Sequence, residues 1–307
     1  GAMVFSEQEL LALVASIFDS GDNADVLVGI GDDAAVVRGS SHQVITTDVA
    51  VEDVHFSKRW SSAFDIGRKA TAANIADILA MGAKPQYLVV ALTLTGDEEL
   101  TRVEELARGI KSEADKTGAI VVGGDISRGS AISIAITAIG SVERAITRAG
   151  AKPGEGIYIS SLTGWSAAGL YLLTHEIEPI HAVHAMALNE FRAPTLDYAC
   201  DFTRAGALCD TSDSLLISLQ AIAQASSVEL NIDVVAIESA YEFKELSLLA
   251  ESVGIDVFDW IFGGGEDHVF VATGIDLPGI RIGSVKPGKG VSGIEMKKAP
   301  QMWRHFQ

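Results

Sequence analysis

The sequence is poor in cysteine, in basic residues and in long apolar runs, and each shortage excludes a class of protein. Only 2 cysteines occur among 307 residues, Cys200 and Cys209; they match neither a CxxC pair nor a zinc site, so we expect two small buried thiols. We find no apolar run that would span a membrane and no secretory signal, so we expect a cytoplasmic protein without a membrane partner. Lys and Arg total 23 against 41 Asp and Glu, and the formal net charge of −18 disfavours nucleic acid as a partner.

Aromatic residues are also scarce, at 7%, while hydrophobic residues make up 48% of the chain. Small side chains must therefore do much of the packing, and this composition is typical of an α/β protein. The length suggests about two domains of roughly 150 residues each. The polar, turn-rich segment GAKPGE at residues 150–155 is the best candidate boundary. We therefore predict an N-terminal domain over residues 4–149 and a C-terminal domain over residues 150–307.

What the sequence does contain is a series of acidic residues in short motifs marked by glycine, threonine or serine. Most of them follow apolar runs, where an isolated carboxylate is costly. The motifs are GIGDDAAVV with Asp32 and Asp33, VITTDV with Asp48, ANIADILAMGA with Asp77, VVGGDISRG with Asp125, DTSDS with Asp210 and Asp213, and FGGGEDH with Glu266 and Asp267.

These carboxylates would repel one another if the chain brought them together. Two unit charges 4 Å apart repel by about 4 kcal/mol at an effective dielectric constant of 20. Lysine is nearly absent from the motifs, so a divalent cation is the natural counter-charge, and Mg²⁺ is commonly shared between carboxylates and substrate phosphates. The motifs therefore favour a nucleoside triphosphate held through several Mg²⁺ ions, with phosphoryl transfer by positioning and charge neutralisation.

Each motif also has an ordinary structural explanation when it is taken alone. Asp32 could lie in a turn, Asp48 could cap a helix, and Asp210 could help to cap the helix predicted for the LLISL run that follows. Asp77 is harder to explain, because it lies in an apolar helical stretch. The occurrence of all these motifs in one chain favours a shared functional role.

Hydrophobic periodicity predicts helices and strands that alternate through both halves. Residues 6–19 are expected to form an amphipathic helix, with Ser6 as its N-cap and Glu9 three residues on. A strand over 119–122 is expected to end at Gly123-Gly124-Asp125, where glycine permits close approach of a ligand. Residues 181–206 are expected to be helical, with an interruption at Pro194.

Two glycine motifs are rejected as nucleotide-binding signatures. Residues 29–34 fit GxGxxA, but the following residues predict a strand, a turn and a second strand instead of the helix that a dinucleotide site requires. Residues 283–289 fit GxxxxGK, but Gly290 stands where Ser or Thr would hold Mg²⁺, and no helix pattern follows. We expect a flexible surface loop there.

Taken in order, the motifs resemble those of the thiamine-monophosphate kinase family, within a superfamily that includes aminoimidazole ribonucleotide synthetase, selenophosphate synthetase and the hydrogenase maturation ATPase. The resemblance covers about residues 5–307 and also involves TTDVAVEDVHF, AITRAGAKPGE and SAAGL. It implies direct in-line phosphoryl transfer from ATP to thiamine monophosphate, giving ADP and thiamine diphosphate. It also implies two α/β domains and a homodimer in which the N-terminal sheets form a barrel.

The resemblance assigns roles to individual residues. It implies Mg²⁺ binding by Asp33, Thr46, Thr47, Asp48, Asp77, Asp125, Asp210 and Asp213. It implies contacts to ATP from Gly124, Asp125, Arg148 and Ser212. It implies contacts to thiamine monophosphate from His55, Glu266 and Trp303, and no covalent or acid–base catalytic residue. Taken alone, His55 could be an ordinary histidine at a strand end and Trp303 could pack the tail.

The chain departs from the family pattern at several of these sites. Ser214 replaces the Gly that usually follows Ser-Asp, Ser218 replaces a later Asp, and His268 replaces the usual Tyr after Glu-Asp. A Tyr that stacks near the nucleotide in relatives is replaced around Arg108. Two alternatives therefore stay open: another ATP-dependent member of the superfamily, or a non-catalytic protein that binds nucleotide and metal.

Overall fold

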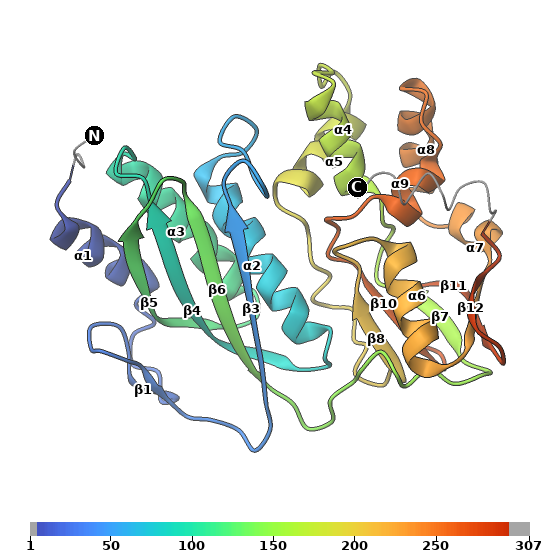
Figure 1. The fold of residues 1–307 in the computed structure, drawn as a ribbon, viewed down its shortest axis with the longest axis horizontal. Helices are drawn as coiled ribbons and strands as arrows, with labels where there is room; N and C mark the ends of the chain where they lie inside the picture. Colours follow the sequence, from blue (N-terminus) through green and yellow to red (C-terminus); the bar gives the residue numbers. More distant parts are fainter. Residues whose placement is uncertain (1–4, 295–307) are drawn as a thin grey trace. The chain divides into compact units, whose positions relative to one another are not determined.

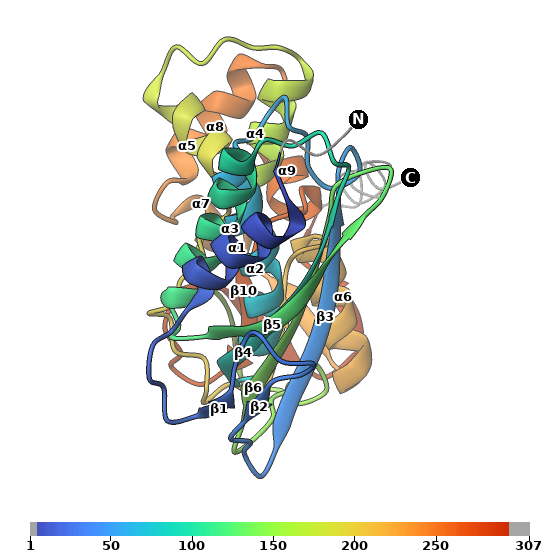
Figure 2. The same cartoon turned by 90° about the vertical axis from the view of Figure 1, so that its left-hand side faces the viewer.

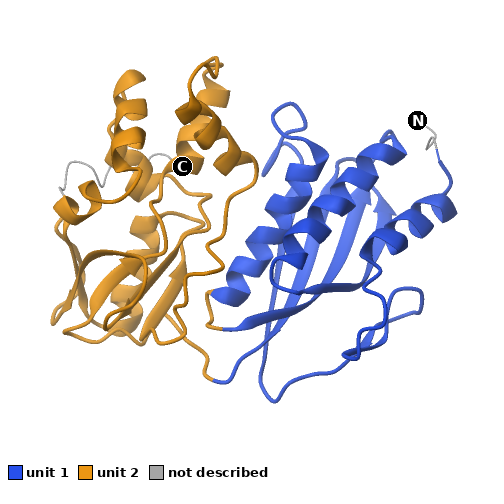
Figure 3. Ribbon diagram, turned by 180° about the vertical axis from the view of Figure 1, so that it is seen from behind, with its two compact units in different colours: residues 1–79, 83–143 blue, residues 80–82, 144–307 orange. Residues whose placement is uncertain are grey.

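The computed structural model describes residues 5–294, which divide into two compact units. The first unit contains the residues up to Leu79 and Ala83–Glu143, and the second contains Ala80–Gly82 and the residues from Arg144 onward (Figure 3). Trp303 lies outside the described residues. Most helices and strands of both units are labelled in Figure 1, and β2 is labelled in Figure 2.

The first unit is built on a four-stranded sheet with the order β3-β6-β4-β5. Its strands are β3 (Gln43–Val51), β6 (Ser133–Ser141), β4 (Lys84–Leu94) and β5 (Ile120–Arg128). β6 runs antiparallel to both β3 and β4, whereas β4 and β5 are parallel. A separate two-stranded sheet joins β1 (Val26–Val28) to β2 (Val36–Val37). The strands β3 and β5 therefore form the two opposite edges of the main sheet.

Helices α1 (Glu7–Phe18), α2 (Ala63–Leu79) and α3 (Leu100–Asp115) lie on one face of this sheet (Figure 2). In β6 the fully buried Ile134, Ile136 and Ala138 alternate with partly buried residues, as expected for a strand with one covered face. α2 and α3 pack tightly because Gly67 lies against the Leu106 carbonyl, where a Cβ would collide with it. The covered face is therefore the core of this unit.

The second unit has a six-stranded sheet with the order β12-β9-β11-β7-β10-β8. All neighbouring strands are antiparallel except β12 and β9. The strands are β7 (Gly156–Ile159), β8 (Ala207–Asp210), β9 (Glu229–Ile232), β10 (Phe270–Gly274), β11 (Ile280–Lys286) and β12 (Gly290–Ser292). The helices are α4 (Trp165–Thr174), α5 (Ala182–Arg192), α6 (Leu215–Ser226), α7 (Val234–Glu238), α8 (Phe243–Ser252) and α9 (Val257–Gly263).

Several local predictions are confirmed. Ser6 caps α1 by accepting a hydrogen bond from the Glu9 N–H. The residues after Gly29-Ile30-Gly31 form no helix: they lead through a loop into β2, so the dinucleotide fingerprint is correctly rejected. No helix follows residue 289 either, since β12 begins there. Both cysteines are free; the expected burial is confirmed for Cys209 and wrong for Cys200, which is partly exposed.

Other local predictions are wrong. The strand predicted over 119–122 continues as β5 to Arg128, so Gly124 and Asp125 lie within the strand and not beyond its end. The helix predicted over 181–206 ends at Arg192, as the expected interruption at Pro194 requires, but no helix resumes after Pro194 and residues 195–206 form a loop that leads into β8. Residues 280–286, expected in part as a loop, form β11.

Within the described residues, none of the helices combines the length and the apolar character needed to cross a lipid bilayer.

Candidate functional site

One group of the predicted metal ligands lies at the β3 edge of the first unit. In the register with β6, Thr46 lies opposite Ala138 and Asp48 lies opposite Ile136. Both partners are fully buried on the helix-covered face, so the side chains of Thr46 and Asp48 lie on that same face. Asp77 of α2 meets Thr46 there, with its Oδ2 3.5 Å from Thr46 Oγ1. Three oxygen-bearing side chains from one strand and one helix therefore share this edge.

Thr47 lies on the opposite face of the sheet, as the alternation of a strand requires. Its Oγ1 donates a hydrogen bond to the Ile136 carbonyl at 3.1 Å and accepts one from Thr137 Oγ1 at 3.2 Å. The fold therefore directs the side chain of Thr47 away from Thr46 and Asp48, although the three residues are consecutive.

A second group surrounds a cavity of about 500 Å³ in the same unit. The loop between β1 and β2 contributes Asp32 and Asp33, and β5 contributes Gly124 and Asp125. Gly124 is required by the backbone packing, because a Cβ at this position would collide with the Val90 carbonyl oxygen. This cavity brings together three carboxylates and the glycine that was predicted to contact ATP.

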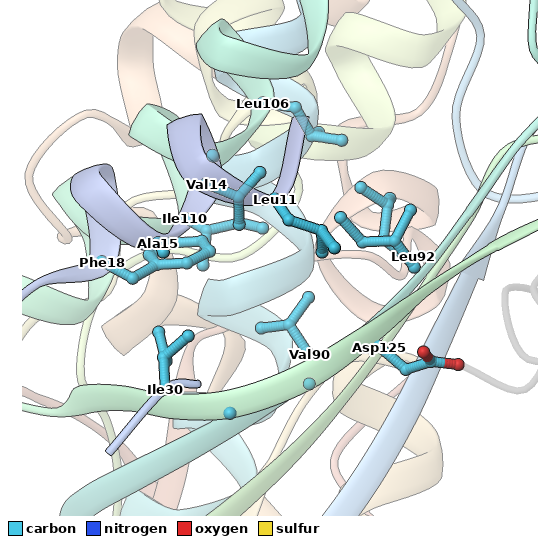
Figure 4. A pocket seen from close by; sticks show the side chains of 14 residues that line it. Leu11, Val14, Ala15, Phe18, Ile30, Val90, Leu92, Leu106, Ile110 and Asp125 are labelled. Atoms are coloured by element: carbon cyan, nitrogen blue, oxygen red, sulfur yellow. The ribbon is translucent and has the colours of Figure 1, made fainter. Parts of the chain in front are cut away.

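A smaller apolar pocket of about 90 Å³ adjoins the same stretch of β5 (Figure 4). Leu11 and Phe18 of α1 line it, together with Ile110 of α3. In Figure 4 the Asp125 carboxylate points away from these apolar side chains. Arg108 does not line the pocket; it is paired with Glu104 at 2.8 Å.

His55 lies in the exposed turn that follows β3. Its Nδ1 accepts a hydrogen bond from the Val51 N–H at 2.9 Å. The neutral ring must therefore carry its proton on Nε2, which can donate to an anion.

In the second unit, Asp210 ends β8 and is largely buried, with its side chain 10% exposed. Its Oδ1 accepts the Ser212 N–H at 2.8 Å, and its Oδ2 lies 3.3 Å from His268 Nδ1. Burial alone would raise the pKa of Asp210, but the hydrogen bonds from His268 and Ser212 and the charge of His268 outweigh burial and lower this pKa. The fold therefore keeps Asp210 ionised.

Arg148 and Ser212 lie close to Asp210. Residue 147 runs alongside β8, since the Leu208 N–H donates to the Thr147 carbonyl at 3.2 Å. The Arg148 side chain interacts with the Cys209 thiol, next to Asp210. Asp213 is exposed, two residues before α6 begins at Leu215.

The two serines that depart from the family pattern each make a structural hydrogen bond. Ser214 is the N-cap of α6, and its Oγ accepts the Ile217 N–H at 3.1 Å. Its backbone is extended, with φ −179°, so no glycine is needed there. Ser218 Oγ donates to the Asp210 carbonyl at 2.7 Å. Both replacements are therefore compatible with an ordered Asp210–Asp213 segment.

Glu266 lies in the loop between α9 and β10, beside the same segment. Its N–H donates to the Ser212 carbonyl at 2.7 Å. The neighbouring Asp267 is buried and accepts hydrogen bonds from the Gly164 and Ser166 N–H groups. Burial raises the pKa of Asp267 to about 7, although these two donors act in the opposite direction.

The described residues contain no group of three or more His, Cys, Asp or Glu side chains that could hold a metal ion by themselves. The predicted ligands belong to two compact units, and within the first unit they divide between the β3 and β5 edges. The sequence identified Asp267 in the FGGGEDH motif without a role for it, and it gave no indication of the contact between His268 and Asp210. The signal for Asp267 was an acid between Glu266 and an apolar strand, a position where a carboxylate must find buried donors.

Comparisons with known proteins identify relatives over most of the chain. Residues 31–142 match the family "AIR synthase related protein, N-terminal domain". The thiamine-monophosphate kinase of Mycobacterium tuberculosis is 38% identical over 81% of this chain and 75% of its own length. The thiamine-monophosphate kinase of Aquifex aeolicus is 32% identical over 90% of this chain and 92% of its own length.

Solved structures agree with these relatives. The crystal structure of thiamine monophosphate kinase from Aquifex aeolicus superposes with a TM-score of 0.77 and 28% identity, covering 94% of this chain and 97% of that one. A structure described as AaThiL complexed with AMPPCP and TMP gives the same TM-score over 95% of this chain and 94% of that one. A hydrogenase maturation protein, HypE, with a TM-score of 0.69 but 20% identity, shares the fold.

Proposed function

This chain belongs to the thiamine-monophosphate kinase family, and on that premise we propose that it transfers the terminal phosphoryl group of ATP to thiamine monophosphate, giving ADP and thiamine diphosphate. The observation that carries the proposal is the match to the Aquifex aeolicus enzyme at 32% identity over 92% of that enzyme's length. A related structure holds AMPPCP and TMP together, as expected for an enzyme whose two substrates meet directly.

Mg²⁺ is the metal that the site would hold. Thr46, Asp48 and Asp77 offer a hydroxyl and two carboxylates at one sheet edge, and these hard oxygen donors suit Mg²⁺. Asp33 and Asp125 offer further carboxylates beside the 500 Å³ cavity of the first unit. Asp210 and Asp213 offer two more carboxylates in the second unit. The metal would neutralise the phosphates of the nucleotide against this acidic surface.

ATP would be bound by main-chain groups and by a cationic side chain. The backbone around Gly124 is accessible in the cavity and carries no side chain that would block a phosphate. Arg148 supplies a guanidinium beside β8, and Ser212 lies at the start of the loop that leads to α6. The apolar pocket beside Gly124 is a suitable environment for the flat, weakly polar nucleobase.

Thiamine monophosphate would be held by groups of opposite character. The His55 Nε2 proton can be donated to its phosphate, because Nδ1 is already engaged. The Glu266 carboxylate suits the cationic thiazolium or the aminopyrimidine donors. The role proposed for Trp303 concerns a residue outside the described part of the chain.

The phosphate of thiamine monophosphate is itself the nucleophile, so the enzyme needs neither a covalent intermediate nor a general base. Catalysis then depends on holding the two substrates in line and on stabilising the charge of the transferring group. Asp210 supports this role: it is kept ionised, and its position is fixed by Ser212, Ser218 and His268.

We also propose a homodimer formed through the four-stranded sheet of the first unit. On the face opposite the helices, Ile45 is 64% exposed and Val49 is 46% exposed. Asp48 and Asp125 lie on opposite edge strands, three strand spacings or about 14 Å apart, too far to share one ion within a single chain. Closure of two sheets into a barrel would bring β5 of one copy to β3 of the other and complete the ligand set.

The test of the proposed function is a coupled assay with purified protein, ATP, Mg²⁺ and thiamine monophosphate. Thiamine diphosphate and ADP should form in equal amounts, and omission of Mg²⁺ should abolish both. Intact, folded protein that forms no thiamine diphosphate would refute the proposal. The alternative of a non-catalytic binder is not favoured, because Ser214 and Ser218 have structural roles that leave Asp210 and Asp213 in place.

A further inference from the structure

The loop that carries Glu266 has a backbone conformation that glutamate rarely adopts. Glu266 has φ +58°, in the left-handed region that is uncommon for residues other than glycine. Gly265 before it has φ +73°. A conformation of this kind persists only where the surrounding structure holds it. The contacts that hold the loop therefore decide where the Glu266 side chain points.

Asp267 provides the side-chain contacts that hold this loop. Its carboxylate is 5% exposed; Oδ2 accepts the Gly164 N–H at 2.8 Å and Oδ1 accepts the Ser166 N–H at 3.2 Å. These N–H groups belong to the first turn of α4, where they have no partner inside the helix. A carboxylate at this helix end is also favoured by the helix dipole. The loop is thereby fixed to a helix about one hundred residues earlier in the chain.

Glu266 is fixed through its main chain on both sides. Its N–H donates to the Ser212 carbonyl at 2.7 Å, and its carbonyl lies 3.3 Å from Ser166 Oγ, whose single proton is shared with the Glu190 carbonyl at 3.0 Å. The Ser166 N–H is bound by Asp267, so the same serine joins both residues to α4. A shift of the Asp267 carboxylate would therefore shift Glu266.

We propose that Asp267 is a positioning residue for thiamine monophosphate: it does not touch the substrate, but it holds the backbone of Glu266 so that the Glu266 carboxylate faces the thiamine. This inference rests on the proposed function. Ser212 is held independently by Asp210, at 2.8 Å, so loss of the Asp267 contacts should affect thiamine monophosphate and leave ATP binding nearly unchanged.

Steady-state kinetics of Asp267→Asn test the proposal. The amide keeps one acceptor oxygen and turns an N–H group toward a second donor, so the loop loses one of its two anchors. KM for thiamine monophosphate should rise about tenfold, while KM for ATP stays within about twofold. Glu98→Gln is the matched control, because Glu98 is an equally buried carboxylate that accepts the Thr95 and Gly96 N–H groups in the first unit. It should leave both KM values unchanged.

A double-mutant cycle distinguishes positioning from a general structural role. In a Glu266→Gln background, Asp267→Asn should raise KM for thiamine monophosphate by less than about twofold, since its effect passes through Glu266. The proposal would be overturned if Asp267→Asn raised KM for thiamine monophosphate equally in the wild-type and Glu266→Gln backgrounds, or left this KM unchanged. It would also be overturned if Asp267→Asn raised KM for ATP as much as KM for thiamine monophosphate.

Should Asp267→Asn fail to fold, Ser166→Ala decides the question. It removes only the Oγ contact to the Glu266 carbonyl and one to the Glu190 carbonyl, and KM for thiamine monophosphate should rise about threefold. An unchanged KM would overturn the inference. The wild-type enzyme distinguishes failure of the proposed function from failure of this inference. If the wild type forms no thiamine diphosphate, the proposed function is wrong. If the wild type is active and the variants have the same KM for thiamine monophosphate, only the role of Asp267 is wrong.

Discussion

The buried carboxylate of Asp267 should make the stability of the protein depend on pH in a direction opposite to that of most acidic residues. Its pKa is raised from 3.8 to about 7 in the folded chain. The folded state therefore retains a proton that the unfolded chain releases near pH 4. The stability that this group contributes is complete below about pH 4, falls as pH rises, and is lost above about pH 7.

The magnitude follows from the size of the shift. One pKa unit corresponds to about 1.4 kcal/mol, so a shift of about 3 units corresponds to about 4 kcal/mol at most. Between pH 5 and pH 8 the change is about 3 kcal/mol, because only the interval from 5 to 7 contributes. Asn at this position does not titrate. The difference in unfolding free energy between the wild type and Asp267→Asn should therefore change by about 3 kcal/mol from pH 5 to pH 8. The wild type should become less stable relative to the variant as the pH rises.

The assay is urea denaturation followed by circular dichroism at pH 5, 6, 7 and 8, with EDTA present so that metal binding does not contribute. Glu98→Gln is the control, because hydrogen bonds to Thr95 and Gly96 outweigh burial and lower the pKa of Glu98. The stabilisation by Glu98 is present above its unfolded pKa, so its difference from the wild type should stay nearly constant from pH 6 to pH 8. A wild-type minus Asp267→Asn difference that is flat from pH 5 to pH 8 would refute the reasoning.

Three further predictions concern the site itself. Asp48→Asn should lower kcat about 100-fold or more with an unchanged circular dichroism spectrum, because it removes a carboxylate proposed to bind Mg²⁺ at the β3 edge; near wild-type turnover would contradict this proposal. An equal mixture of Asp48→Asn and Asp125→Asn that is denatured and refolded together should regain about a quarter of wild-type activity. Half of the proposed dimers would then be mixed, and each mixed dimer would have one of its two sites intact. Activity no higher than that of either variant alone would place both residues in a site within one chain. Ser214→Ala should lower the unfolding free energy by about 1 kcal/mol and Ser214→Gly by a few tenths, both with wild-type KM for ATP, because Ser214 acts as a helix cap; a large rise in this KM would show that the hydroxyl serves the nucleotide instead.

The sequence was sufficient to predict the elements whose signals are local. The Ser6 cap depends on residues three positions apart, and the strand–turn–strand character of residues 35–47 is a local pattern, so neither required knowledge of the fold. The extent of β5 was not predictable in this way. Gly123 and Gly124 are unfavourable in an isolated strand, and only pairing with β4 carries the strand through them to Arg128.

The sequence yields a proposed set of site residues, but not their arrangement in space. Nothing in the sequence places Asp48 and Asp125 on opposite edges of one sheet, because that separation results from the strand order β3-β6-β4-β5. The opposite orientations of Thr46 and Thr47 follow from the strand period once the covered face is known. The contact between His268 and Asp210 depends on the pairing of β10 with β8 across 58 residues of chain, which no local pattern reports.

The homodimer proposed through the exposed face of β3, with Ile45 and Val49, would make activity depend on the concentration of the enzyme. Assembly through this face would follow mass action, so dilution should populate separated chains that lack the full proposed ligand set. Specific activity should then fall as the assay concentration is reduced, and preincubation with substrates should restore it by favouring the assembled form. Cells that make little of this protein would have a smaller active fraction as well as a smaller total amount.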